Sequence, residues 1–154
     1  MRPAIAIAMI VASAVITAGA TLAQDAKPSA PAGEPNFTGL GEIMALQQMR
    51  HIKLWFAGSA DNWPLADYEI GELGGGFEDA TELLGGDIVR QHVGEPMSEL
   101  KKSIESKDSA AFAIAFDKLS AGCNACHHAL DHGFIVIQRP RLSPYSNQDF
   151  APQK

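Results

Sequence analysis

The only two cysteines of the 154-residue chain lie three positions apart in the segment AGCNACHHALDHG, which spans residues 121–133. This segment ends the most regular helical pattern of the sequence, in which residues that suit a buried face recur every three or four positions: Phe112, Phe116, Leu119, Cys123, His127 and Leu130. The spacing predicts a helix with one buried face. Asp108 is expected to cap its start, and Gly133 to end it. Any fold of this chain must therefore hold both thiols on one helix, near its end.

Two further helices are predicted at the start of the folded part, which begins near residue 37. The first covers about residues 38–58, with Thr38 as its cap and its apolar positions at intervals of three and four. The second covers about residues 63–84 and is capped by Asp61 or Asn62. Residues 74–76 of that helix are all glycine, and each costs about 1 kcal/mol in a helix interior. A kink or a close approach to a neighbouring helix is expected there.

The sequence between residues 85 and 107 predicts a linker followed by a short third helix. Residues 85–96 are expected to form the linker, and Pro96 to open a helix that ends near Lys107. No stretch between residues 37 and 133 has a convincing strand pattern. The predicted fold class is therefore all-α, an antiparallel four-helix bundle formed by residues 37–133. Residues 134–154 are expected to form an extended C-terminal tail over the bundle.

The N-terminal residues predict export. Residues 1–23 combine Arg2 with an almost unbroken apolar run and small residues at its end, which is the pattern of a secretory signal peptide. An uncleaved membrane anchor is the alternative, although the run is slightly short for a membrane span. Both predict a folded part outside the cytoplasm, and the signal peptide predicts a periplasmic protein with no membrane contact in its mature form. Residues 24–36 are rich in Pro and Ala and are expected to be a disordered leader.

Three interpretations of the two thiols compete. A disulfide or redox-active pair is disfavoured, because it would close only a short loop and because a helix C-terminus does not stabilise a thiolate. A zinc site would use four residues within one helix: Cys123, Cys126, His128 and His132. Cys123 and His128 point to different faces of that helix, so the helix would have to break to surround one ion.

The third interpretation is covalent haem attachment. Residues 123–127, CNACH, match C-x-x-C-H, in which the two thiols add to the two vinyl groups of a haem and the adjacent imidazole binds its iron. Covalent attachment takes place after export, so the predicted signal peptide supports this interpretation. We therefore expect one haem c that is attached to Cys123 and Cys126, with His127 as the proximal iron ligand.

A helical bundle with CNACH near the end of its last helix resembles the class II c-type cytochromes, the cytochrome c-prime group and its low-spin relatives. The resemblance covers about residues 38–133, and the haem motif is its specific part. It implies a soluble periplasmic haem protein, often a homodimer, with His127 as the fifth iron ligand and redox proteins as partners. The sequence departs from the family pattern directly after the motif, where residues 128–132 read HALDH.

The sixth iron position decides what such a protein does. In an up-down bundle Met44 lies level with His127, and its thioether would give a His/Met iron suited to electron transfer; a core methionine is the alternative. His51 lies on the same helix face about 10 Å further along the axis, and it is either a rival ligand, a polar core residue or a propionate partner. Arg50 is a candidate propionate contact, or part of a solvated helix edge. The other histidines are expected at the surface: His92, His128 and His132.

The expected function is that of a periplasmic monohaem c-type cytochrome that transfers single electrons. A haem protein with five-coordinate iron that binds NO or CO is the alternative, and a non-haem metal-binding protein is a weaker one. The chain has 12 basic and 18 acidic side chains and no Lys/Arg run, which argues against nucleic acid as a partner. No acid–base pair, nucleophile–base set or phosphate loop is recognisable, so no enzymatic activity is expected.

Overall fold

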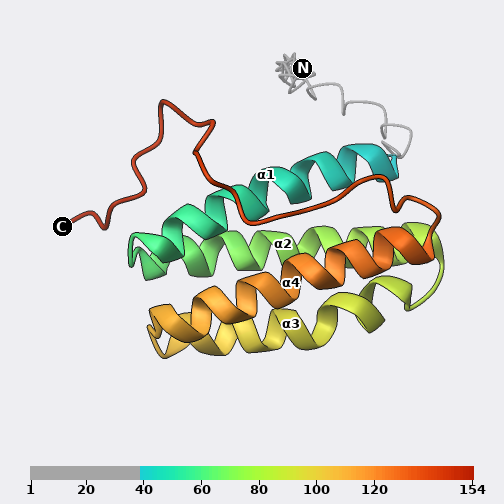
Figure 1. Cartoon of the computed structure of the whole chain (residues 1–154), viewed down its shortest axis with the longest axis horizontal. Helices are drawn as coiled ribbons and strands as arrows, with labels where there is room; N and C mark the ends of the chain where they lie inside the picture. The colour runs from blue at the N-terminus through green and yellow to red at the C-terminus, as the bar shows by residue number, and fades with distance from the viewer. Residues whose placement is uncertain (1–38) are drawn as a thin grey trace, which may run out of the picture. The chain divides into compact units, whose positions relative to one another are not determined.

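The computed structural model of the chain describes residues 39–154, and these residues form four helices and no strand. The helices lie side by side (Figure 1) and are α1 (Leu40–Ser59), α2 (Trp63–Leu84), α3 (Ile88–Glu105) and α4 (Ser109–Ala129). The predicted all-α fold class is confirmed, and the arrangement is compatible with a four-helix bundle. None of these four helices has the length and apolar character that a membrane crossing requires. The predicted signal peptide (1–23), leader (24–36) and Thr38 cap lie outside the described residues.

Two side-chain caps fix the starts of α2 and α4. The side-chain oxygen of Asn62 accepts a hydrogen bond from the Leu65 N–H at 3.3 Å. Asp108 Oδ1 accepts from the N–H groups of Ala110 and Ala111 at 3.0 and 2.9 Å. Each cap satisfies backbone donors that have no partner within the helix, and both confirm the caps expected from the sequence.

The last helix ends at Ala129, ahead of the predicted end at Gly133. Asp131 adopts a positive φ of 61°, and the His132 N–H donates to the His127 carbonyl at 2.7 Å. This is the hydrogen bond of a Schellman motif, which most often uses glycine at the left-handed position. The prediction that Gly133 ends this helix is therefore wrong, because Asp131 takes the left-handed position. The chain leaves α4 directly after the cysteine–histidine segment.

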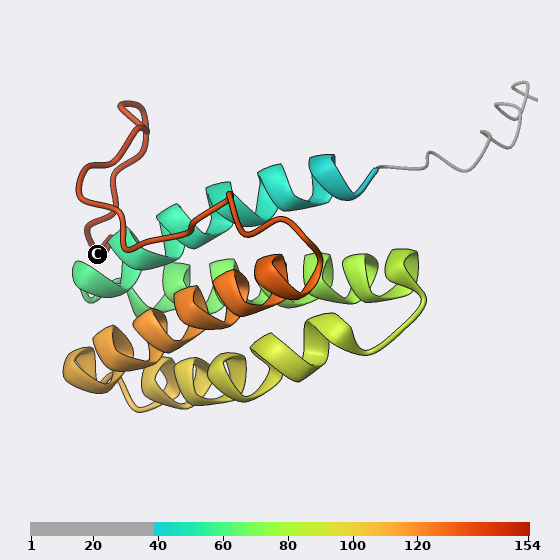
Figure 2. The ribbon, with the colours of Figure 1, turned by 45° about the vertical axis from the view of Figure 1, so that its right-hand side comes forward.

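The prediction of a linker at residues 85–96 and of a helix opening at Pro96 is wrong, because α3 already begins at Ile88. The turn before it is short and contains Gly85, which has a φ of 69°. Pro96 lies inside α3, where it cannot donate a hydrogen bond to the carbonyl of His92. A bend along α3 is visible in Figure 2. The helix tolerates the proline because one buried face runs through it: Val89, Val93, Leu100 and Ile104.

Two glycines allow neighbouring helices to approach closely. A Cβ atom on Gly122 of α4 would lie 2.5 Å from the carbonyl oxygen of His92 and 3.7 Å from Pro96 of α3. The carbonyl that Pro96 leaves without its helical donor therefore lies against Gly122. A Cβ atom on Gly76 of α2 would collide with the side chain of Gln47 from α1. The glycine-rich part of α2 thus serves a close helix approach, while α2 remains one continuous helix.

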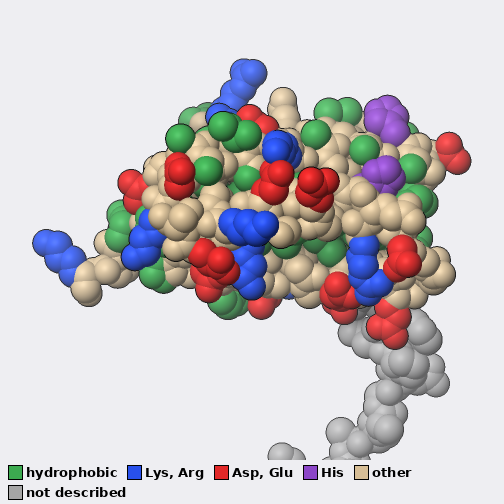
Figure 3. Space-filling view, turned by 90° about the horizontal axis from the view of Figure 1, so that it is seen from below, with side chains coloured by type: hydrophobic (Ala, Val, Ile, Leu, Met, Phe, Trp, Pro, Cys, Tyr) green, Lys and Arg blue, Asp and Glu red, His purple; other side chains and the backbone are tan. Residues whose placement is uncertain are grey.

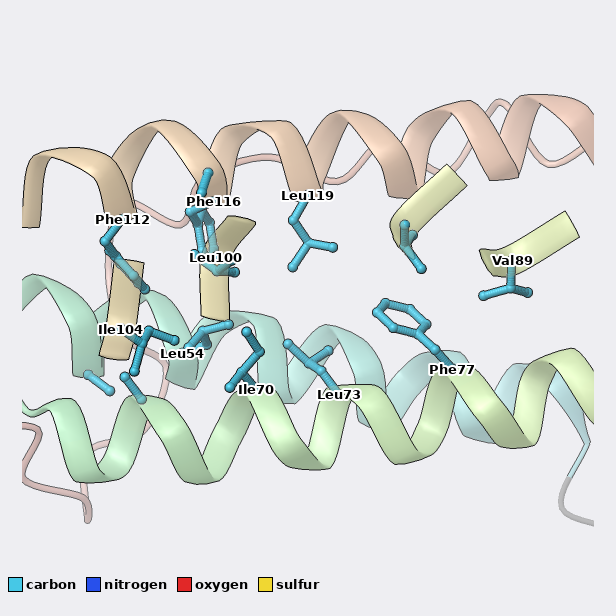
Figure 4. Close-up of a cluster of buried hydrophobic side chains, with 14 of the residues drawn as sticks. Leu54, Ile70, Leu73, Phe77, Val89, Leu100, Ile104, Phe112, Phe116 and Leu119 are labelled. Atoms are coloured by element: carbon cyan, nitrogen blue, oxygen red, sulfur yellow. The ribbon is translucent and has the colours of Figure 1, made fainter. Parts of the chain in front are cut away.

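Large apolar side chains fill the end of the domain at which α1 leads into α2 and α3 into α4. Figure 4 shows side chains from all four helices pointing toward one another there. The partly buried Trp55 and Trp63 pack around Phe112, with ring centroids 6.1 and 6.0 Å from that of Phe112. The largest fully buried side chains are Leu54, Leu73, Leu100, Phe112, Phe116 and Leu119.

The seam between α1 and α4 is closed by the C-terminal segment rather than by helix contacts. α1 packs mainly against α2 and α4 mainly against α3, whereas α1 and α4 make few direct contacts. The first part of the segment that follows α4 runs along this seam, and the rest loops out from the helices toward the C-terminus (Figures 1 and 2). Arg139 pairs with Asp117 of α4 and lies 4.3 Å from the Trp55 ring of α1. Further along, Asn62 donates to the carbonyl of Phe150 at 3.1 Å.

Charged side chains of both signs are interspersed on the face of the molecule shown in Figure 3. Ion pairs between partly or fully exposed side chains also join neighbouring elements, such as the pair of Lys118 of α4 with Glu99 of α3 at 2.6 Å. Because such exposed pairs are screened by water, they contribute little to stability. The helix packing therefore depends on the apolar core and on the close glycine contacts.

Replacing Gly122 with alanine is expected to lower the free energy of unfolding by about 1–3 kcal/mol, because the new methyl group would overlap the His92 carbonyl, and a backbone atom cannot move aside cheaply. Chemical denaturation monitored by far-UV circular dichroism measures the change. Gly75→Ala is the matched control, since its Cβ would meet nothing within 4 Å and helix propensity favours alanine. Equal effects of the two variants would contradict the close α3–α4 contact.

Candidate functional site

A cavity of about 380 Å³ occupies the end of the domain that the large core side chains do not fill. All four helices and the C-terminal segment contribute to its wall. The wall is mostly apolar, and among its apolar side chains are Leu40, Ala45, Leu73, Phe77, Leu84, Val89, Val93, Leu119 and Leu130. A mostly apolar cavity of this size, with a few polar groups, is typical of a small-molecule or cofactor site.

Both cysteines of the CNACH motif line this cavity from α4. They are free thiols, with Cys126 buried and Cys123 partly buried. Burial raises the pKa of Cys123 to about 12, with a smaller contribution from the neighbouring Cys126, and burial also raises the pKa of Cys126. Both groups are therefore neutral thiols at pH 7, which is the opposite of the low-pKa thiolate of a redox-active cysteine pair.

His127 lines the cavity next to the two thiols, and its orientation is fixed by the C-terminal segment. Its Nδ1 lies 3.0 Å from the backbone carbonyl oxygen of Ile135. Because a carbonyl only accepts hydrogen bonds, Nδ1 carries the hydrogen and Nε2 of a neutral ring keeps its lone pair. A backbone acceptor on one ring nitrogen is the usual arrangement for a histidine that binds a metal through the other.

The two candidate distal ligands, Met44 and His51, both line the cavity from α1. His51 is buried, and its Nε2 lies 2.9 Å from the Ser120 hydroxyl, which itself donates to the Phe116 carbonyl at 3.0 Å. Since the hydroxyl hydrogen is already used, His51 Nε2 must be the donor to Ser120. Burial lowers the pKa of His51 to about 4, so the ring is neutral at pH 7.

The contact between His51 and Ser120 sets the register of α1 against α4. Ser120 lies two helical turns before His127, a distance of about 10 Å along the axis. Met44 lies the same two turns before His51, and the two helices run in opposite directions (Figure 1). Met44 is therefore brought to the level of His127, whereas His51 lies deeper in the domain.

Arg50 does not line the cavity. Its guanidinium forms an ion pair with Glu72 of α2 at 3.0 Å and donates to the side-chain oxygen of Gln47 at 3.0 Å. Gln47 in turn donates to the Leu73 carbonyl at 2.7 Å, so this network joins α1 to α2. The assignment of Arg50 as a propionate contact stays a prediction.

The four residues of the alternative zinc site are not gathered around one point. Among residues 39–154 no three His, Cys, Asp or Glu side chains form a group that could hold a metal ion. His128 is exposed, as predicted. His132 is also exposed, but it contributes to the cavity wall, which the sequence analysis did not anticipate.

Sequence reasoning also missed Ile135 and Ile137, whose side chains line the cavity from the C-terminal segment. Residues 134–137 are all apolar, so the sequence has no alternation that would separate these two side chains from the more exposed Phe134 and Val136. Comparisons of the chain with protein-family models, curated proteins and solved structures gave no match. The resemblance to the class II cytochromes therefore depends on the CNACH motif and the helix pattern alone.

Acidification is expected to destabilise the fold through His51. Its pKa lies near 4 in the folded protein and near 6.5 when unfolded, so the unfolded state alone gains a proton as the pH falls through this window. The free energy of unfolding should fall by up to about 3 kcal/mol between pH 6.5 and pH 4. Urea denaturation at a series of pH values measures this loss, and His51→Gln should reduce it. An identical pH dependence in this variant would show that His51 is not its source.

Proposed function

We propose that the chain is a monohaem c-type cytochrome that transfers single electrons. The observation that carries this proposal is the convergence of both cysteines, His127 and Met44 on one largely apolar cavity. In this proposal the domain is an antiparallel bundle whose last helix holds the haem and whose C-terminal segment lies over it. Export to the periplasm and redox proteins as partners belong to the same proposal.

The residues of the cavity suit a haem. Cys123 and Cys126 lie one helical turn apart, so both thiols reach the same edge of a planar ring. Each S–H adds across a vinyl double bond, with the sulfur bonded to one carbon and the hydrogen to the other. The bound iron would supply a reversible one-electron change, while the apolar wall keeps water from it.

His127 would hold the iron from the α4 side. The hydrogen bond from its Nδ1 to Ile135 leaves Nε2 as the ligating atom and makes it a stronger donor. Met44 is our proposed ligand on the opposite side, because the register set by His51 and Ser120 brings it level with His127. A His/Met pair raises the reduction potential and suits electron transfer.

The apolar character of the cavity wall supports a second candidate function, the binding of a small gas molecule. The α1 residues next to Met44 on the cavity wall include the apolar Leu40 and Ala45. If Met44 only packs against the ring, the iron stays five-coordinate and faces an apolar site that admits NO or CO. The sixth ligand therefore separates an electron carrier from a gas-binding protein.

Covalent attachment is tested by the mass of the exported protein, produced in cells that mature c-type cytochromes. We expect one haem added to the mature polypeptide, and none after the double replacement Cys123→Ala with Cys126→Ala. His128→Ala is the control, because this exposed neighbour has no part in the proposed site. A bare polypeptide mass in the unmodified protein would overturn the proposal.

The distal ligand is tested by spectroscopy of three variants. Met44→Ala should convert the ferric protein from low-spin to high-spin, whereas His51→Ala should leave the spin state unchanged. Met97→Ala is the matched control, since Met97 is partly buried but does not line the cavity. A high-spin spectrum in the unmodified protein, together with CO binding, would favour the gas-binding function.

A further inference from the structure

We propose that residues 134–139 form a strap that is part of the haem site, and that Asn124 is the positioning residue that holds it. The strap begins directly after the turn that ends α4 and runs back along the seam between α4 and α1 (Figure 2). This inference rests on the proposed function, because it assigns a role to the strap in positioning the iron ligand His127.

The strap is fixed to α4 at three successive levels. The carbonyl of Ile135 accepts from His127 Nδ1 at 3.0 Å. One turn back, Asn124 Nδ2 donates to the Ile137 carbonyl at 2.8 Å, and Asn124 Oδ1 accepts from the Ile137 N–H at 2.7 Å. Two turns further back, Arg139 donates to Asp117 of α4 at 3.0 Å.

The pairing of Asn124 with Ile137 fixes the register of the strap. One primary amide satisfies both backbone groups of a single residue, so a shift of the strap by one residue would break two hydrogen bonds at once. Asn124 is also one of the two variable residues of the C-x-x-C-H motif. The motif therefore supplies the thiols, the iron ligand and the residue that holds the strap over them.

The side chains of the strap alternate between the cavity and the solvent. Ile135 and Ile137 line the cavity, with Ile135 still 43% exposed at its rim, whereas Phe134 and Val136 are 80% and 68% exposed. The strap thus has two effects on the site. It covers the seam that α1 and α4 leave open, and it places a carbonyl where His127 needs an acceptor.

Asn124→Ala tests the strap in the haem-loaded protein with two measurements. Hydrogen exchange of the Ile137 amide should become about five- to tenfold faster, because its acceptor is lost. The midpoint potential should shift upward, because a loosened Ile135 carbonyl makes His127 a weaker donor and destabilises the ferric iron. Ile137→Pro, which removes the donated N–H and leaves the motif intact, should shift the potential in the same direction. Gln138→Ala, at an exposed position whose side chain makes no hydrogen bond in the described chain, is the control.

The two measurements separate the contact between Asn124 and the strap from the effect of the strap on His127. Unchanged exchange of the Ile137 amide would show that Asn124 does not hold the strap. Faster exchange of the Ile137 amide in Asn124→Ala, together with an unchanged potential in both strap variants, would show that Asn124 holds the strap but that the strap does not position His127. The absence of haem from the unmodified protein would instead overturn the proposed function, and the exchange measurement would still report on the contact between Asn124 and Ile137.

Discussion

The separation of α1 from α4 is the constraint on which the rest of the structure depends. Helices that carry large apolar side chains along their whole length would close against one another and leave no cavity. Here Leu54, Phe112 and Phe116 fill only one end of the domain. Toward the other end α1 presents Met44 and Gly41, and α4 presents the two thiols. The helix pairs α1–α2 and α3–α4 pack tightly, so the open volume is confined to the seam between them.

Much of the fold could be predicted from local sequence signals. α2 has the predicted boundaries, and Asn62 and Asp108 cap the helices expected of them. The errors occurred where tertiary contacts outweigh local preference. Pro96 predicts a helix start, but the buried face that continues through it and the contact of the His92 carbonyl with Gly122 stabilise one long α3. Gly133 predicts a helix end, but Asp131 adopts the left-handed conformation earlier.

Some residues of the candidate site could likewise be predicted from local sequence signals, and others could not. Cys123, Cys126 and His127 could be selected from spacing alone, because the proposed haem attachment requires them to be close together on the chain, and the structure places all three on one cavity. Met44 could be selected only by assuming a register, which the contact between His51 and Ser120 now supports. The part played by Ile135 and Ile137 could not be found from helical periodicity, since they lie in an extended segment whose contacts with α4 are made through backbone groups.

The end of the domain that is packed with Leu54, Phe112 and Phe116 bears on the order in which the protein folds and acquires its proposed cofactor. Its apolar contacts join all four helices through side chains such as Leu54, Ile70, Leu100 and Phe112, so in the proposed haem protein this end can pack before the cofactor is attached. In the proposed haem protein, the opposite end would gain a packing partner when the ring enters the cavity whose wall contains both thiols. In that proposal the attachment machinery would meet a preformed but open domain, and covalent attachment of the haem would complete its folding.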